Sequence, residues 1–305
     1  MMSINSISAI GLGAIGCTYY SKLYDYNSNI IKIIAGGERG LRYKKNGFVI
    51  NGKRYDFTYV NPEEKCSPAD LVIISVKSTQ LAQALCDIKN HIGKNTIIIS
   101  LLNGITSEKI IGEYFKTDNI IYSLCIGDSN RDGNRVDFSD MCHINFGEEK
   151  NDVYSENVKA VKELFDRSKI NYNIPLDMIH ELWWKFMVNV GINQVSAILK
   201  SNYGDFKKSG YAKELMNKAM FEVIELSKKA GVNLNEDDLN KWYKRLDSIN
   251  PNSRTSMCQD IIYGRKTEVD IFAGTVCKLG ENYDLDTPIN RVFLDIIKAM
   301  EEVSN

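Results

Sequence analysis

Histidine is scarce in this chain of 305 residues, and its cysteines lack the spacing of a metal or disulfide framework. The three histidines, His91, His143 and His180, stand apart, and the seven cysteines include no C-x-x-C pair. Structural zinc sites usually gather four such ligands at short spacing. An odd number of scattered cysteines is typical of reduced thiols in a cytoplasmic protein. The sequence therefore predicts neither a metal site nor a disulfide scaffold.

Long apolar runs and an excess of charge of one sign are also missing. No run approaches the roughly 20 apolar residues of a membrane span. The first basic residue is Lys22, so the charged start of a secretory signal is absent. The 38 basic and 39 acidic residues give a net charge of −1, which favours neither nucleic acid nor membrane as a partner. We expect a cytoplasmic protein with no nucleic-acid or membrane partner.

In the first half of the chain, short apolar runs alternate with helical patterns. The runs lie at 6–10, 29–35, 71–76, 96–102 and 119–125. Helical spacing occupies 13–24, 78–92 and 106–115. Nearly continuous apolar strands are typical of a parallel sheet that is covered on both faces. The alternation predicts a Rossmann-type doubly wound α/β domain at 1–175.

In the second half of the chain, helical patterns follow one another without strand-like runs between them. They lie at 177–200, 209–230, 236–249, 254–280 and 287–303. No strand-like run of comparable quality follows Pro175. The sequence therefore predicts an all-α domain at 176–305, which we expect to carry the substrate and the catalytic groups.

A glycine-rich loop, "GLGAIG", follows the first strand and opens the first helix. Gly11 permits a tight turn, Gly13 lets the backbone approach a pyrophosphate, and Gly16 lets helix and strand pack closely. A dinucleotide's phosphates bind to the free N–H groups at such a helix start. The alternative is a turn with no ligand. We predict cofactor binding along the whole loop, which comprises Gly11, Leu12, Gly13, Ala14, Ile15 and Gly16.

The end of the second strand bears on the choice between NAD and NADP. NAD sites usually carry an acidic residue there to bind the ribose hydroxyls. This chain reads "GGERGLRYKK", in which Glu38 is accompanied by the basic residues Arg39, Arg42, Lys44 and Lys45. Arg39 is the best placed of several basic residues to pair with a 2′-phosphate. The alternative is a solvated basic face of a helix. The sequence favours NADP (NADPH) as the cofactor.

The stretch "ELWWKFMVNVGIN" places one lysine and two amides in an otherwise apolar helical run. Lys185, Asn189 and Asn193 fall within about 80° on a regular helix. Burying such groups without partners costs several kcal/mol for a charge, so a ligand is one explanation for them. The alternative is a lysine that reaches the surface and asparagines that cap nearby backbone.

A second polar group lies in "NPNSRTSMCQDIIYGRKTEVD". Ser256 and Asp260 are one helical turn apart, and Glu268 follows. One continuous helix would rotate Glu268 by about 120° from Ser256. The alternative for Glu268 is a surface carboxylate that pairs with Arg265 or Lys266.

Together these motifs resemble the 2-dehydropantoate 2-reductase (ketopantoate reductase) family over essentially the whole chain. The segments that carry the resemblance are "GLGAIG", "SVKSTQ", "LLNGI", "RDGN", "ELWWKFMVNVGINQVSAI", "SRTSMCQDIIYGRKTEVD" and "DTPIN". The resemblance implies an NADP-dependent oxidoreductase that reduces the C2 ketone of 2-dehydropantoate to pantoate in pantothenate and coenzyme A biosynthesis.

The resemblance also assigns roles. Lys185 corresponds to the catalytic lysine and proton donor, and Glu268 to a catalytic carboxylate that also contacts the cofactor. The substrate-binding positions are Asn103, Asn189, Asn193 and Ser256. Lys77 and Asn103 correspond to residues on the cofactor side.

Three departures from the family pattern leave alternatives open. Gly36 stands where many members carry arginine, Ala273 precedes Gly274 where Asn-Gly is common, and Gln194 replaces a proline of some members. A reductase of another 2-oxo or 3-hydroxy acid, and an NADP(H)-binding sensor without turnover, therefore stay open. The resemblance implies a small 2-oxo acid as the substrate, and a homodimer is the assembly that we expect.

Overall fold

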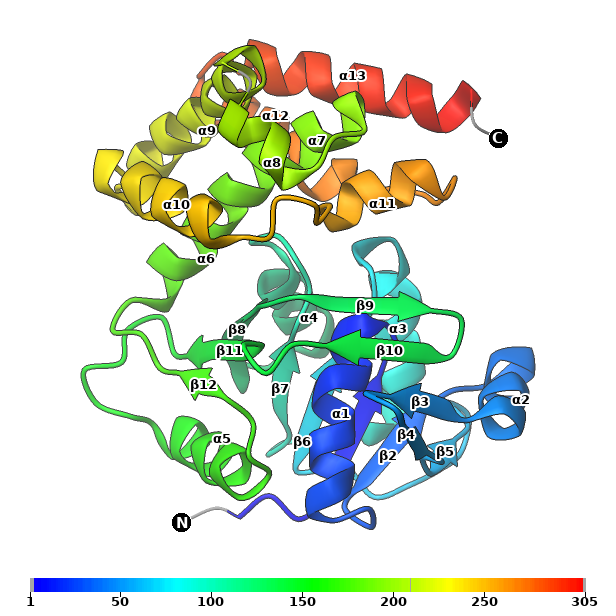
Figure 1. The fold of residues 1–305 in the computed structure, drawn as a ribbon. Helices are drawn as coiled ribbons and strands as arrows, with labels where there is room; N and C mark the ends of the chain where they lie inside the picture. The colour runs from blue at the N-terminus through cyan, green and yellow to red at the C-terminus, as the bar shows by residue number, and fades with distance from the viewer. Residues whose placement is uncertain (1–2, 209, 304–305) are drawn as a thin grey trace. The chain divides into compact units, whose positions relative to one another are not determined.

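The computed structural model describes residues 3–208 and 210–303. The chain divides into two compact units, Met1–Ile179 and His180–Asn305 (Figure 1). This division lies a few residues after the predicted boundary at 175/176. No helix in the described ranges is long and apolar enough to cross a membrane.

Unit 1 is built on an eight-stranded sheet with the strand order β12-β11-β8-β7-β6-β1-β2-β5. All its pairings are parallel except that of β8 with β11. The strands are β1 (Ile7–Ile10), β2 (Ile31–Ile34), β5 (Tyr59–Val60), β6 (Leu71–Ile74), β7 (Ile97–Ser100), β8 (Ile120–Ile126), β11 (His143–Gly147) and β12 (Tyr172–Asn173). Every residue of β1, β6 and β7 is buried, which explains their continuous apolar runs.

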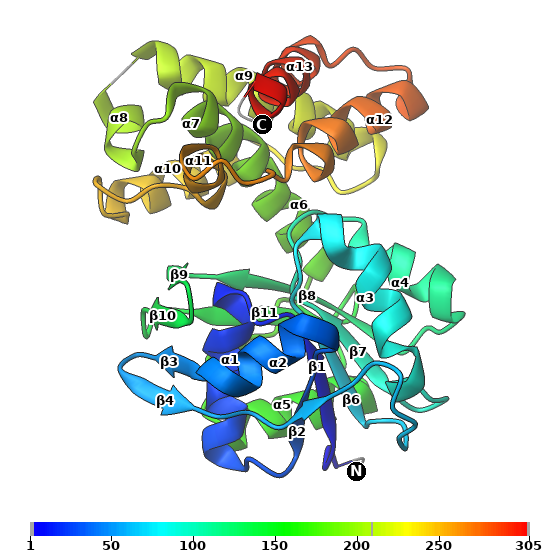
Figure 2. The ribbon, with the colours of Figure 1, turned by 90° about the vertical axis from the view of Figure 1, so that its right-hand side faces the viewer.

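Helices cover both faces of this sheet (Figure 2). α1 (Ala14–Tyr26) and α5 (Glu156–Arg167) contribute to one hydrophobic core, and α3 (Leu81–Ile88) and α4 (Ser107–Phe115) to another. The predicted doubly wound α/β architecture is confirmed.

The sequence patterns did not indicate a second, four-stranded sheet with the order β4-β3-β10-β9. Its strands are β3 (Phe48–Ile50), β4 (Lys53–Tyr55), β9 (Ser129–Asp132) and β10 (Arg135–Phe138), and α2 (Gly37–Asn46) precedes it. Asn51 and Gly52 join β3 to β4 with positive φ at both positions, as a tight hairpin turn requires.

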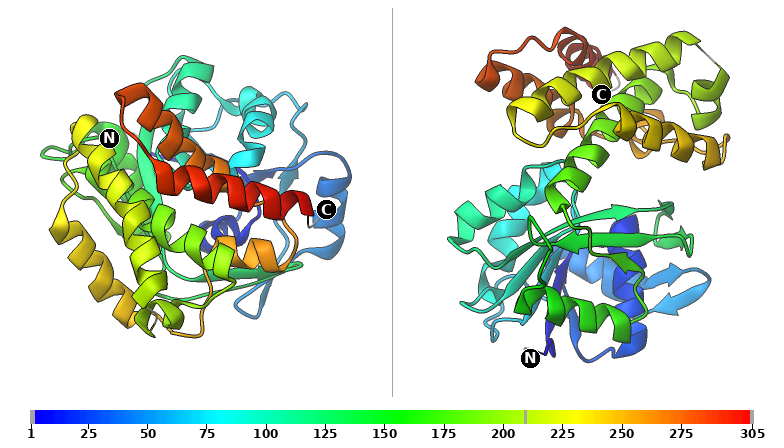
Figure 3. Two further views of the ribbon diagram at one scale, coloured as in Figure 1. Left: turned by 90° about the horizontal axis from the view of Figure 1, so that it is seen from above. Right: turned by 90° about the vertical axis from the view of Figure 1, so that its left-hand side faces the viewer.

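The described part of unit 2 is helical, as predicted (Figure 3). Its helices are α6 (beginning in unit 1 at Met178, Met178–Val188), α7 (Gln194–Leu199), α8 (Tyr203–Lys208), α9 (Gly210–Lys229), α10 (Glu236–Ser248), α11 (Ser256–Ile262), α12 (Ala273–Tyr283) and α13 (Pro288–Val303). α13 packs on α7, α9 and α12.

The single helix predicted at 254–280 is wrong. α11 ends before Gly264, whose φ of +62° turns the chain, and the short 3-10 segment η4 (Val269–Ile271) precedes α12. The break is held by hydrogen bonds from the Arg265 N–H to the Asp260 carbonyl (2.8 Å) and from the Thr267 N–H to Glu301 Oε1 (2.8 Å).

The helix predicted at 177–200 contains a π-helical turn, η3 (Asn189–Asn193), between α6 and α7. Single π turns inside α-helices occur frequently at functional sites. η3 packs against α9 at Gly191, where a Cβ would lie 2.5 Å from Met220 Cε and 3.1 Å from Met216 Cγ. Glycine therefore permits the close contact between these two helices.

We predict that Gly191→Ala destabilises unit 2 by about 1–3 kcal/mol, because the added methyl group overpacks this contact. Gly274→Ala is the matched control. A Cβ there would meet nothing nearer than the Val269 carbonyl at 3.7 Å, and alanine is the better helix former. Chemical denaturation measures both changes. Equal unfolding free energies for Gly191→Ala and the wild type would contradict the packing argument.

Candidate functional site

Most residues that we assigned to the cofactor lie along one edge of the main sheet of unit 1. Neighbouring strands β7, β6, β1 and β2 run parallel, so their carboxyl ends meet at that edge. Asn103 follows β7, Lys77 follows β6, Gly11 follows β1, and Arg39 follows β2. The chain order reverses between β1 and β6, and ligands of open α/β sheets bind at such a switch point.

The three loop glycines each meet a different physical requirement. Gly11 has a φ of +97°, and a Cβ would lie 2.5 Å from the Ser75 carbonyl oxygen. At Gly16 a Cβ would lie 2.1 Å from the Gly11 carbonyl oxygen. At Gly13 it would meet only the Ser75 carbonyl oxygen, at 3.9 Å. The first and third glycines therefore permit the turn and the helix–strand contact, while the second leaves one side of the loop open.

Gly13 is also the N-cap residue of α1, and the first turn of that helix contains no acidic residue. The first N–H groups of a helix lack partners within the helix, and they carry partial positive charge. An open glycine backbone at this position fits a pyrophosphate. Within the predicted loop, Leu12 and Gly16 are buried, and Ala14 and Ile15 are half-buried.

Ser75 and Tyr20, to which we assigned no role, form hydrogen bonds that support the glycine loop. Ser75 Oγ donates to the Gly11 carbonyl (2.7 Å) and lies 2.8 Å from the Tyr20 hydroxyl, which donates to the Ile10 carbonyl (3.1 Å). Burial raises the pKa of Tyr20, so its hydroxyl stays protonated as a donor. Ser75 lies in the motif "SVKSTQ", but its partners become adjacent only in the folded sheet.

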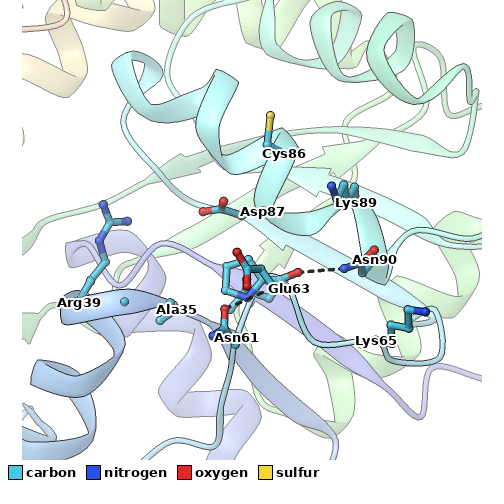
Figure 4. A pocket seen from close by; sticks show the side chains of 13 residues that line it. Ala35, Arg39, Asn61, Glu63, Lys65, Cys86, Asp87, Lys89 and Asn90 are labelled. Carbon is cyan, nitrogen blue, oxygen red and sulfur yellow. Dashed lines mark hydrogen bonds between the residues drawn. The ribbon is translucent and has the colours of Figure 1, made fainter.

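A cavity of about 650 Å³ lies beyond the end of β2 (Figure 4). Its charged lining residues are Arg39, Glu63, Lys65, Asp87 and Lys89. Of the basic residues on α2, Arg39 alone lines the cavity in the described part of the chain, and its side chain is exposed. This placement suits Arg39 for an anionic group bound in the cavity.

The structure explains the glycine at position 36. A Cβ at Gly36 would lie 2.8 Å from Pro62 Cδ and 3.1 Å from Asn61 Oδ1. An arginine there would require the Pro62 segment to move. Any arginine that binds a 2′-phosphate must therefore come from another position.

In unit 2, the polar row of α6 and η3 lies among buried apolar side chains. Trp184 and Phe186, on either side of Lys185, are 4% and 1% exposed. Lys185 and Asn189 are half-buried, and Asn193 is 5% exposed. The regular helix assumed for this row is wrong beyond Asn189. A π turn still returns Asn193 to nearly the same side, because it closes from residue i to i+5.

Ser256 lies on α11, and this helix contacts the segment that continues the polar row. Ser196 Oγ, on α7, lies 2.7 Å from Thr255 Oγ1, and both residues are buried. Thr255 caps α11 by accepting from the Cys258 N–H (3.1 Å). Ser256 is the exposed first residue of α11, and α11 packs against both α7 and η3.

Glu268 is a buried residue rather than the surface carboxylate of the alternative interpretation. It is 8% exposed and lies at the N-cap of η4. Arg265 pairs with Asp260 at 2.9 Å, from Nε to Oδ1. Glu268 lies in unit 2, unlike the other residues that we assigned to the cofactor.

Gln194 and Ala273, two of the departures from the family pattern, contact each other inside the helical core of unit 2. Both are fully buried. Gln194 Oε1 accepts from the Ala273 N–H (3.1 Å), and Nε2 donates to the Val190 carbonyl (2.7 Å) and to Asn290 Oδ1 (3.0 Å). The glutamine thereby connects the end of η3 with the starts of α12 and α13. Its polar side chain therefore forms hydrogen bonds inside the helical core.

The described residues contain no group of three or more histidine, cysteine, aspartate or glutamate side chains that could hold a metal ion.

The sequence was compared with known protein families. The family model "Ketopantoate reductase PanE/ApbA" matches residues 7–151, and "Ketopantoate reductase PanE/ApbA C terminal" matches residues 177–301. The chain belongs to the ketopantoate reductase family. As a member of this oxidoreductase family, it carries the NAD(P)-binding Rossmann fold described above. The resemblance inferred from the motifs is thereby confirmed.

Relatives match the chain along nearly its whole length. The 2-dehydropantoate 2-reductase of Streptococcus pyogenes serotype M3 is 27% identical over 300 residues, which cover 97% of each chain. That of Aquifex aeolicus is 27% identical over 304 residues, which cover 96% of each.

Solved structures show the same fold. A D-mandelate dehydrogenase in a ternary structure with NADH and anilino(oxo)acetate has a TM-score of 0.88 and 25% identity, covering 98% of this chain and 99% of its own. A dimeric ketopantoate reductase from Staphylococcus aureus has a TM-score of 0.84 and 18% identity, covering 98% and 100%.

Proposed function

We propose that the protein is an NADPH-dependent 2-dehydropantoate 2-reductase that forms pantoate for pantothenate and coenzyme A biosynthesis. The observation that carries the proposal is the row of Lys185, Asn189 and Asn193 in a buried apolar helix of a ketopantoate reductase family member. A structural helix at this position would gain stability from leucine or alanine, so the retained polar groups point to a ligand.

On the cofactor side, unit 1 supplies the binding groups. The N–H groups at the start of α1 bind the pyrophosphate over the open side of Gly13. Arg39 pairs with the 2′-phosphate in the cavity beyond β2, and Lys77 and Asn103 bind the nicotinamide half. Bound NADPH supplies the hydride that reduces the C2 ketone of the substrate.

On the substrate side, unit 2 supplies the acid and the binding groups. Lys185 donates a hydrogen bond and then its proton to the ketone oxygen as negative charge develops there. Preorganised donors of this kind contribute about 10²–10³ in rate. Glu268 stabilises the charged form of the lysine and contacts the cofactor. Asn189, Asn193 and Ser256 bind the carboxylate and hydroxyl groups and fix the reactive pose.

A second candidate is the NADH-linked reduction of another 2-oxo acid. It is favoured by Gly36, where Pro62 leaves no room for a strand-end arginine. It is also favoured by the similarity to a D-mandelate dehydrogenase whose structure contains NADH.

A substrate panel tests both candidates through the absorbance of the reduced nicotinamide. We expect the purified protein to oxidise NADPH most efficiently with 2-dehydropantoate, and to work less well with pyruvate-type and phenyl-substituted 2-oxo acids. Higher kcat/KM for NADH with a phenyl-substituted 2-oxo acid would establish the second candidate. Tight NADPH binding without turnover of any 2-oxo acid would instead indicate a sensor.

Arg39→Ala tests the cofactor preference. We expect the Kd for NADPH to rise about tenfold, because a charged hydrogen bond to the 2′-phosphate is lost, while the Kd for NADH stays within twofold. Arg42→Ala, one turn further along α2 and outside the cavity lining, is the control. Calorimetric titration measures the Kd of the wild type and of both variants for NADPH and for NADH. Equal losses for both cofactors would refute the pairing with the 2′-phosphate.

Lys185→Ala tests the proton donor. We expect kcat to fall by about 10²–10³ with the Kd for NADPH nearly unchanged, because the lysine acts on the ketone oxygen. Lys244→Ala, at an exposed position on α10, should leave kcat at the wild-type value. Steady-state kinetics measures both variants, and full turnover by Lys185→Ala would remove the lysine from the mechanism.

A further inference from the structure

Arg131 connects the small sheet of unit 1 to the glycine loop, although none of the roles assigned above uses it. It lies on β9 and is half-buried. Its Nη1 donates to the Leu12 carbonyl, and its Nε donates to the Gly133 carbonyl at 2.7 Å. Its guanidinium carbon lies 5.2 Å from the centre of the Phe48 ring. These three contacts fix the side chain's position.

The hairpin that carries Arg131 is itself fastened to α1. Ser129 Oγ, on the same strand, lies 2.8 Å from Thr18 Oγ1. Arg131 pairs across the hairpin with Val136, which is fully buried, and β10 continues the sheet to β3. Both strands of the hairpin pack against α1 (Figure 1). The strand that carries the guanidinium is therefore held against α1 by packing and by a side-chain hydrogen bond.

The hydrogen bond from Arg131 to the Leu12 carbonyl also sets the direction of the Gly13 N–H. A peptide unit is planar and trans, so the Leu12 C=O and the Gly13 N–H point in opposite directions from the same plane. Holding the carbonyl on the Arg131 side directs the Gly13 N–H to the opposite side. Gly13 is where the loop is open, since a Cβ added there would meet only the Ser75 carbonyl oxygen, at 3.9 Å.

Arg131 also brings charge to the start of α1. Burial raises the pKa of the Cys17 thiol to about 12, and the positive charge of Arg131 opposes that shift. Cys17 is in the first turns of α1, whose first turn has no acidic residue. The positive charge therefore adds to the partial charge of the helix start, where an anion is favoured.

We propose that Arg131 is a positioning residue for the pyrophosphate of the dinucleotide, acting through the Leu12–Gly13 peptide. It holds the Gly13 N–H toward the phosphate and raises the positive potential of the loop. The proposal rests on the proposed function for the identity of the ligand, a nicotinamide dinucleotide.

Calorimetric titration of the full chain with NADPH tests this role without turnover. We expect Arg131→Ala to raise the Kd about tenfold, the usual scale for a lost charged hydrogen bond. Arg131→Lys, which keeps charge and donor, should recover most of the affinity. The matched control is Arg135→Ala, on the partner strand of the same hairpin. Arg135 is exposed and pairs with Asp137, so this variant should bind within twofold of the wild type.

A second ligand separates positioning of the pyrophosphate from a general loss of structure. The probe 2′-AMP has the adenine, ribose and 2′-phosphate but no pyrophosphate, so we expect its Kd to be unchanged in Arg131→Ala. If Arg131→Ala does not fold, Arg131→Met replaces it, since methionine keeps a long side chain and loses both the charge and the donor. Thermal melting without ligand verifies the fold of each variant.

Three results would overturn the proposal. Equal NADPH affinity in the wild type and Arg131→Ala would remove Arg131 from the site and leave the proposed function intact. Equal losses for NADPH and 2′-AMP would show that Arg131 supports the whole of unit 1 rather than the pyrophosphate. Failure of the wild type to bind NADPH or NADH would refute the proposed function together with this inference.

Discussion

The contact between the glycine loop and the end of β6 is the constraint on which the candidate cofactor site depends. The main chain of Gly11 lies against Ser75 so closely that a Cβ would overlap its carbonyl group, and Gly16 closes the same contact from α1. This contact places the start of α1 at the carboxyl ends of the paired strands β1 and β6. The open face of Gly13, the Ser75–Tyr20 hydrogen bonds and the Arg131 contact all surround it. Unit 2 has an analogous constraint, in which Gly191 brings η3 against α9.

Five of the eight strands of the main sheet could be predicted from the sequence because they are largely buried on both faces, whereas β5, β11 and β12 were not predicted. The five apolar runs became β1, β2, β6, β7 and β8, since continuous burial leaves a continuous apolar signal. The small sheet leaves no such signal. Its strands have three or four residues, and β4 and β9 are largely exposed or half-buried. Asn-Gly and Asp-Gly pairs stand at its two hairpin turns, but the parallel pairing of β3 with β10 joins segments that lie far apart in the sequence.

The polar row of the candidate site can be recognised in the sequence, whereas the contacts around it cannot. Lys185, Asn189 and Asn193 stood out because polar groups interrupt an apolar helix, and the structure places them among buried side chains. Gln194 was noted only as a departure from the family pattern, because its hydrogen-bonding partners are not adjacent to it in the sequence. Ala273 and Asn290 lie 79 and 96 residues away from it. The break between α11 and α12 was missed for a related reason, since Thr267 is held by the distant Glu301.

The π turn of η3 gives this segment one residue more than an α-helix of the same rise would hold. That additional residue sets the rotation of everything beyond it, because each residue of an α-helix turns the next by about 100°. Deleting this residue would rotate Gln194 about the helix axis and away from the Ala273 N–H. The three buried groups that Gln194 contacts, which are the Ala273 N–H, the Val190 carbonyl and Asn290 Oδ1, would then lose a hydrogen bond. The length of η3 therefore sets how α7, α12 and α13 fit together, so a one-residue deletion here would disturb several helices at once.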